Sequence, residues 1–163
     1  MRYIIVIFLA LASLSHSAYA QRQTSSQNRT SRADSDSLAV QKAAEEFIKA
    51  FNNLEWGKFR NSFSDDVTVF FPFNQDPRRA NGRAEVETSF KSGFDELRKR
   101  KPNPPYLNIQ PKDVQIQMLK DTAILTFHLP GEDTFGRRTL VFQKQKGKWL
   151  IVHLHASIIS KPK

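Results

Sequence analysis

The sequence predicts an α+β domain in which three N-terminal helices pack on one face of a curved, mostly antiparallel sheet. Between residues 37 and 100, apolar residues recur at the i, i+3, i+4 spacing of helices that bury one side. From residue 114 onward, apolar and polar residues alternate, which is typical of strands with one buried face. The strands are short and no glycine-rich phosphate loop is present, which argues against a nucleotide-binding α/β fold.

Three helices are expected in order. The first follows an Asp/Ser cluster at residues 34–37 that can cap it, and its apolar face comprises Val40, Ala43, Ala44, Phe47, Ile48 and Phe51. The second is short and carries Trp56, Phe59 and Phe63 on one side. The third follows Gly82, ends in the basic stretch 98–101 before Pro102, and buries Val86, Phe90, Phe94 and Leu97.

The strands follow from β-rich or alternating segments that end at turn residues. One early strand is expected at 67–71, before Pro72. Four more are expected near 114–118, 121–129, 137–144 and 149–158. The last two form a hairpin across Lys146-Gly147, a two-residue turn in which glycine takes a positive φ.

The first twenty residues have the pattern of a cleavable signal peptide, with Arg2 before an apolar run and Ala18-Tyr19-Ala20 as the cleavage site. The run is too short to span a bilayer, and no cysteine follows it as a lipid attachment site. We therefore expect a secreted or periplasmic protein, cleaved after Ala20, with no stable membrane anchor. Residues 21–36 are almost devoid of apolar side chains and are predicted to be a disordered spacer, in which Asn28 begins a glycosylation sequon. The domain is assigned to residues 37–160.

Composition excludes several classes of function. The chain contains no cysteine, so disulfides, thiol catalysis and cysteine metal sites are excluded. Without Arg2 the mature chain has 24 basic and 16 acidic residues, a net charge of +8. These charges are scattered rather than gathered on one face, and with the export signal they argue against a nucleic-acid partner. A location outside the cytoplasm also favours a pocket that works without a cofactor.

The closing hairpin carries the candidate site. With an unbroken two-residue turn, Arg138 faces His155, Leu140 faces His153 and Phe142 faces Ile151. One face then carries Arg138, Leu140, Phe142, Trp149, Ile151, His153, His155 and Ser157. An apolar wall with a polar cluster at one end is the layout expected of a small-molecule cavity.

The string Trp149-x-Ile151-Val152-His153-x-His155-x-Ser157, with Lys146-Gly147-Lys148 before it, resembles the closing hairpin of the NTF2-like superfamily. The similarity is greatest to its SnoaL-like branch and to the association domain of calcium/calmodulin-dependent protein kinase II. Residues 51–67 and the glycine of Asn81-Gly82-Arg83 resemble the opening elements of the same fold, so that the resemblance covers nearly all of 37–160.

The resemblance implies a cone-shaped half-barrel with a cavity between sheet and helices, and a homodimer formed through the sheet. In the kinase association domain, pocket arginines of the kind that recognise a carboxylate stand where this chain has Leu140 and Ala156. Their absence argues against carboxylate recognition in that manner, although Arg138 could partly substitute. The candidate ligand contacts are Arg138, Trp56, Phe142, His153, His155 and Ser157.

Three functions remain open. The domain binds a small, partly apolar molecule; or it is a cofactor-independent hydro-lyase, isomerase or hydrolase with His153 or His155 as general base; or it is a purely dimerising module. The histidines could equally be hydrogen-bonded members of a strand, and Arg138 could pair with Glu132 or Asp133. No metal site is expected, because zinc requires a third protein ligand beside the two imidazoles.

Overall fold

The computed structural model describes the backbone of residues 13–72 and 79–161, and the side chains from residue 31 onward within these ranges. The chain divides into two units, Met1–Asp36 and Ser37–Lys163. The second unit contains the sheet, the two shorter helices and the last part of the first helix. No helix within the described ranges is long and apolar enough to cross a membrane.

Helix α1 runs without a break from Ser13 to Asn52. The segment 21–36, predicted to be disordered, is therefore helical, and the predicted helix start at residues 34–37 was wrong. Adding residues to an existing helix costs much less than nucleating one, so a polar segment can extend a helix that packing holds downstream. Arg32 and Asp36 support the extension as an i, i+4 ion pair of 4.0 Å. Most of the predicted signal peptide, residues 1–12, lies outside the described residues.

Six strands form one sheet in the order β2-β1-β6-β5-β4-β3. Their bounds are β1 Phe63–Phe70, β2 Ala80–Asn81, β3 Lys112–Leu119, β4 Thr122–Pro130, β5 Thr134–Gln145 and β6 Lys148–Ser160. Only β1 and β6 pair in parallel, and the other neighbours are antiparallel. Phe63, predicted on the second helix, begins β1 instead, because α2 is a single turn, Trp56–Arg60.

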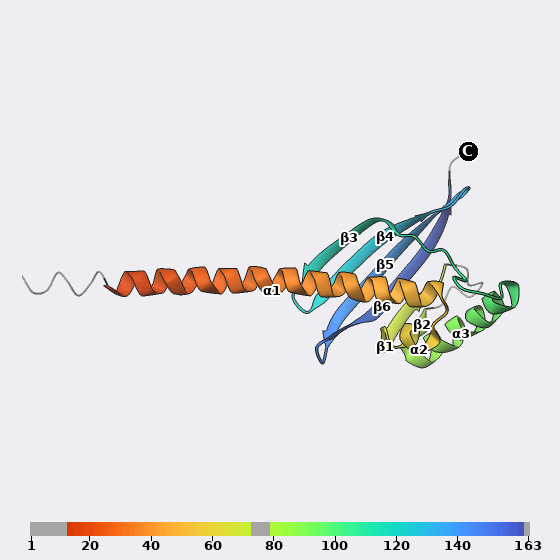
Figure 1. Ribbon diagram of the computed structural model, residues 1–163, viewed down its shortest axis with the longest axis horizontal. Coiled ribbons are helices and arrows are strands. Elements are labelled where there is room, and N and C mark those ends of the chain that lie inside the picture. Colours follow the sequence, from red (N-terminus) through yellow and green to blue (C-terminus); the bar gives the residue numbers. More distant parts are fainter. Residues whose placement is uncertain (1–12, 73–78, 162–163) are drawn as a thin grey trace, which may run out of the picture. The chain divides into compact units, whose positions relative to one another are not determined.

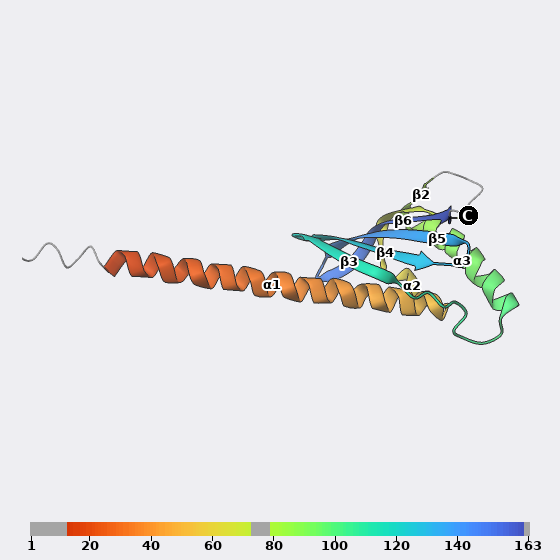
Figure 2. The same cartoon turned by 90° about the horizontal axis from the view of Figure 1, so that it is seen from above.

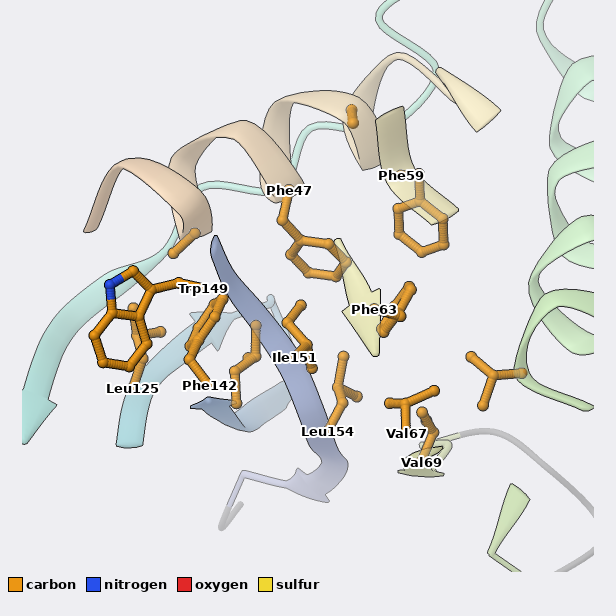
Figure 3. Close-up of a cluster of buried hydrophobic side chains, with 14 of the residues drawn as sticks. Phe47, Phe59, Phe63, Val67, Val69, Leu125, Phe142, Trp149, Ile151 and Leu154 are labelled. Carbon is orange, nitrogen blue, oxygen red and sulfur yellow. The ribbon is translucent and has the colours of Figure 1, made fainter. Parts of the chain in front are cut away.

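In the second unit, the helices lie on one face of the curved sheet, as Figures 1 and 2 show. Helix α3, Gly82–Arg100, has the predicted bounds and buries Val86 and Phe94. The core beneath the helices is rich in phenylalanine, and Figure 3 shows Phe47, Phe59 and Phe63 converging on it. The Phe47 and Phe59 rings stack with centroids 5.2 Å apart. The predicted α+β class and cone-shaped half-barrel are confirmed.

The β5–β6 hairpin follows the predicted turn but departs from the predicted register. Lys146 and Gly147 both have positive φ, 50° and 80°, as a tight two-residue hairpin turn requires. Phe142 faces Ile151 as predicted, but a bulge then shifts the register, so that Val141 faces His153. Val152 is the additional residue, and every later side chain of β6 points to the opposite face from the one predicted.

The shift is explained by what the bulge buries. Beyond it, Leu154 and Ala156 point toward the helices, where each is 6% exposed. Figure 3 shows Leu154 on the same side of β6 as Ile151. An unshifted strand would place two imidazoles there instead, at a cost in desolvation.

Candidate functional site

An aromatic pocket lies between the helices and the inner face of the sheet, with a volume of about 390 Å³. Its walls come from α1, α3, the loop after α3 and strands β4 to β6. Six phenylalanines line it: Phe47, Phe51, Phe71, Phe90, Phe94 and Phe127. A pocket of this volume and lining is of the kind that encloses a small, largely apolar molecule.

The polar side chains of the aromatic pocket are few. Within the described part of the chain, Arg138 of β5 is the one charged residue that lines it, and Ser89 of α3 adds a hydroxyl. No histidine, tyrosine or carboxylate belongs to the described lining. The pocket is therefore suited to enclosing a ligand and orienting it by one cation, and it offers no general base among these residues.

Arg138 is half-buried, and its Nη1 donates hydrogen bonds to the backbone carbonyls of Arg137, at 2.9 Å, and Ser157, at 3.0 Å. Burial lowers the pKa of the guanidinium below its ordinary value. Neither Glu132 nor Asp133 forms an ion pair with it in the described structure. The predicted position of Arg138 on the inner face is confirmed; its role in binding stays a prediction.

The other predicted contacts lie elsewhere. Trp56 packs edge-on against Phe94, with ring centroids 5.7 Å apart, and Phe142 is 1% exposed in the core. Neither belongs to the lining of the aromatic pocket. Because of the bulge, His153, His155 and Ser157 are on the outer face, which is the sheet face away from the helices. The prediction that these three share a face with Arg138 was wrong.

On the outer face, the histidines meet β1 rather than a cavity. The His153 Nδ1 lies 2.8 Å from Thr68 Oγ1, and the Phe70 ring contacts His153 at 6.0 Å and His155 at 5.7 Å between centroids. The pKa of His153 is lowered, first by burial and then by the nearby His155 and Arg79. Burial and these neighbours thus disfavour the charged form of His153, and the contact with Thr68 links the ring to β1.

Asn52 was missed as a residue that builds the pocket. At the end of α1, its Nδ2 donates to the Ile109 carbonyl at 3.1 Å and its Oδ1 accepts from the Ile109 N–H at 2.8 Å. Its own carbonyl accepts from the N–H groups of Tyr106 and Leu107. Leu107 and Ile109 line the aromatic pocket, so Asn52 fixes one of its walls. An asparagine next to the predicted end of a helix was the available signal.

Two further hollows lie at the surface. One, of about 690 Å³, lies between α1 and strands β3 and β4, and the other, of about 820 Å³, lies between α1, α2 and the β5–β6 turn. Charged side chains such as Glu45, Lys42 and Lys148 form part of their walls. No cluster of three or more metal-binding side chains occurs in the described parts of the chain.

Comparison with known proteins gives a family and a fold. The SnoaL-like domain matches residues 40–161. A proposed dehydratase of the NTF2-like family from Streptomyces avermitilis superposes with a TM-score of 0.66 at 19% identity, over 78% of this chain and 99% of that one.

Two other solved structures give the same fold. An uncharacterised protein with a cystatin-like fold from Caulobacter vibrioides has a TM-score of 0.62 at 15% identity, over 76% of this chain and 89% of that one. A proposed ketosteroid isomerase from Shewanella frigidimarina has a TM-score of 0.58 at 24% identity, over 73% and 94%. No curated protein matches the sequence.

Proposed function

The chain belongs to the SnoaL-like domain family, and from that premise we propose that it binds a small, largely apolar molecule in the aromatic pocket. One observation carries the proposal: six phenylalanines line about 390 Å³ of space that the described residues do not fill. Protein interiors are otherwise close-packed, so a space of this size costs stability unless it serves a ligand. Binding is favoured over acid–base catalysis because the described lining carries no group that titrates near neutral pH.

The expected affinity follows from burial. A two-ring aromatic molecule that buries about 200 Å² of apolar surface gains roughly 5 kcal/mol. This corresponds to a dissociation constant of about 0.2 mM before hydrogen bonds and ordering costs are counted. A suitable neutral fluorescent probe is N-phenyl-1-naphthylamine, which has one aromatic ring more and whose emission rises in apolar surroundings.

The test compares two glycines of the helices. Gly93 lines the pocket and Gly57 does not, and a Cβ added at either would meet no atom within 4 Å. Gly93→Phe is expected to weaken binding of the probe at least fivefold, whereas Gly57→Phe should leave it within twofold. Ala156→Phe, inside the pocket, is a second blocking variant. If the probe binds Gly93→Phe and Ala156→Phe as tightly as the original chain, the pocket is not its site and the proposal fails.

We also propose that the protein is exported and forms a homodimer through the outer face of the sheet. The outer face supports the homodimer, because it carries three exposed apolar side chains. Phe70, Leu119 and Ile159 are 37%, 56% and 44% exposed. Association would remove these apolar side chains from water. The signal-peptide pattern of residues 1–20 supports export.

A further inference from the structure

Arg138 brings a positive charge into the aromatic pocket, and no negative charge among the described residues balances it. No carboxylate in the described ranges forms an ion pair with it, and no neighbouring acid shifts its pKa. Burying a cation beside phenylalanine rings is costly unless an anion or hydrogen-bond acceptors compensate it. The two backbone carbonyls at Nη1 compensate only part of the guanidinium.

The hydrogen-bond donors that remain have a particular geometry. A guanidinium has five N–H groups, and the two on Nη1 are used by the carbonyls of Arg137 and Ser157. The N–H of Nε and the nearer N–H of Nη2 remain, and they point the same way along one edge of the plane. Two parallel N–H groups on one edge match the two oxygens of a carboxylate.

Gly136 leaves the space in which this guanidinium lies. It faces Leu129 across the β4–β5 pair, and a Cβ at this position would lie 3.3 Å from Arg138 Nη1 and 3.2 Å from Leu129 Cβ. Both distances are tighter than ordinary carbon contacts. A larger residue would therefore require the guanidinium or Leu129 to shift by a few tenths of an ångström, so that glycine leaves room for the cation at this position.

We propose that the ligand is an organic monocarboxylate with an apolar, two-ring-sized body, whose carboxylate binds Nε and Nη2 of Arg138. This inference rests on the proposed function, since it assigns the chemical class of ligand for the same pocket. A monoanion is favoured over a phosphate group because one cation balances one negative charge, and a second charge would be buried without a partner. The phenylalanines enclose the body and Arg138 fixes its orientation.

The test uses 2-naphthoate and 2-naphthamide, which share a ring system and differ in charge. By isothermal titration calorimetry at pH 7.5, the protein is expected to bind the naphthoate at least tenfold more tightly, or about 1.4 kcal/mol. Arg138→Met should remove this preference and leave naphthamide binding within threefold. Arg138→Lys should keep part of it, since the charge stays and the paired donors are lost.

Arg137→Met is the matched control. Arg137 is the next residue, carries the same charge and is exposed on the outer face, where its Nε donates to Ser157 Oγ at 3.2 Å. Its loss should leave the naphthoate preference within twofold. Equal losses in Arg137→Met and Arg138→Met would overturn the inference, because they would indicate attraction by net charge alone. Circular dichroism melting of each variant identifies one that fails to fold, in which case Arg138→Gln replaces it.

The outcomes separate this inference from the proposed function. If both naphthalene probes bind equally and Gly93→Phe weakens both, the pocket is real and the carboxylate assignment is wrong. If Gly93→Phe weakens neither these probes nor N-phenyl-1-naphthylamine, the proposed function itself fails.

Asp76 belongs to residues 73–78, outside the described ranges, and Asp76→Asn should leave naphthoate affinity within threefold. A tenfold rise in that variant would show that the chain's own carboxylate occupies Arg138, and would overturn the inference.

Discussion

Replacing Leu154 with alanine is expected to destabilise the protein more than replacing the adjacent His153. Leu154 is 6% exposed and points into the core beneath the helices. The substitution deletes three buried carbon atoms, worth about 0.8 kcal/mol each, or about 2.4 kcal/mol in all. The cavity contribution is small, because Leu154 borders the aromatic pocket and the deleted volume joins a space that already exists.

His153 makes one hydrogen bond, to Thr68 Oγ1, and is only partly buried on the outer face. Its replacement by alanine should therefore cost about 1 kcal/mol. In urea, with a slope of about 1.5 kcal/mol per molar, the unfolding midpoint should fall by roughly 1.6 M for Leu154→Ala and 0.7 M for His153→Ala. Fluorescence of Trp56 and Trp149 follows the transition.

The unshifted register makes the opposite prediction, because it places His153 beneath the helices and Leu154 on the exposed face. A larger loss for His153→Ala than for Leu154→Ala would refute the bulge and with it the assignment of faces on β6. Val141→Ala is a useful comparison, since Val141 pairs with His153 on the outer face. It should cost less than Leu154→Ala.

Four further expectations are open to measurement. Asn52→Ala should lower the free energy of unfolding, measured in urea, by about 2 kcal/mol, because each of its two hydrogen bonds to Ile109 contributes about 1 kcal/mol. Asn61 is exposed, and Asn61→Ala should change this free energy by less than about 0.5 kcal/mol. Burial and the nearby His155 and Arg79 lower the pKa of His153 below its ordinary value in the folded chain, so the unfolded chain binds more protons between the two pKa values. Stability should therefore fall as the pH drops through this interval, and His153→Gln should show a flatter pH profile. In sedimentation velocity, the protein should be a dimer that Phe70→Asp weakens at least tenfold, and a monomeric original chain would exclude the dimer. Mass spectrometry of the exported protein should find Gln21 as its first residue, and retention of residues 1–20 would disprove cleavage.

Helix α3 and the β5–β6 turn could be predicted because their limits are local. The α3 helix ends where cations and then Pro102 follow, and the turn requires the positive φ that Gly147 takes at little cost. The extent of α1 could not be predicted in this way. Residues 21–36 lack an apolar face, and whether they are helical depends on the helix that continues from them.

The bulge in β6 could not be predicted from the alternation of apolar residues. Read with a strict period of two, residues 149–158 have one wholly apolar face, formed by Leu150, Val152, Leu154, Ala156 and Ile158, and one face on which Trp149 and Ile151 are followed by His153, His155 and Ser157. With one extra residue at Val152, the inner face becomes Trp149, Ile151, Leu154 and Ala156, all apolar. A wholly apolar face is therefore available with or without the bulge, and the choice between the two depends on the pairing of β6 with β5 and on the core that Trp149 and Ile151 join.

That one extra residue also decides what chemistry the pocket contains. Without it, His153 and His155 would face the helices beside Arg138, and two imidazoles next to a cation could serve as a base and an anion site together. With it, β6 contributes Leu154 and Ala156 to the pocket, and Arg138 of β5 supplies the charge among the described lining residues. Arg138 lies on β5, whose pairing with β4 has no bulge, so the face on which it lies does not depend on the register of β6. The sheet thus separates its ionisable groups, with the guanidinium of Arg138 on the inner face and the imidazoles of His153 and His155 on the outer face, and this separation favours the proposed binding over catalysis.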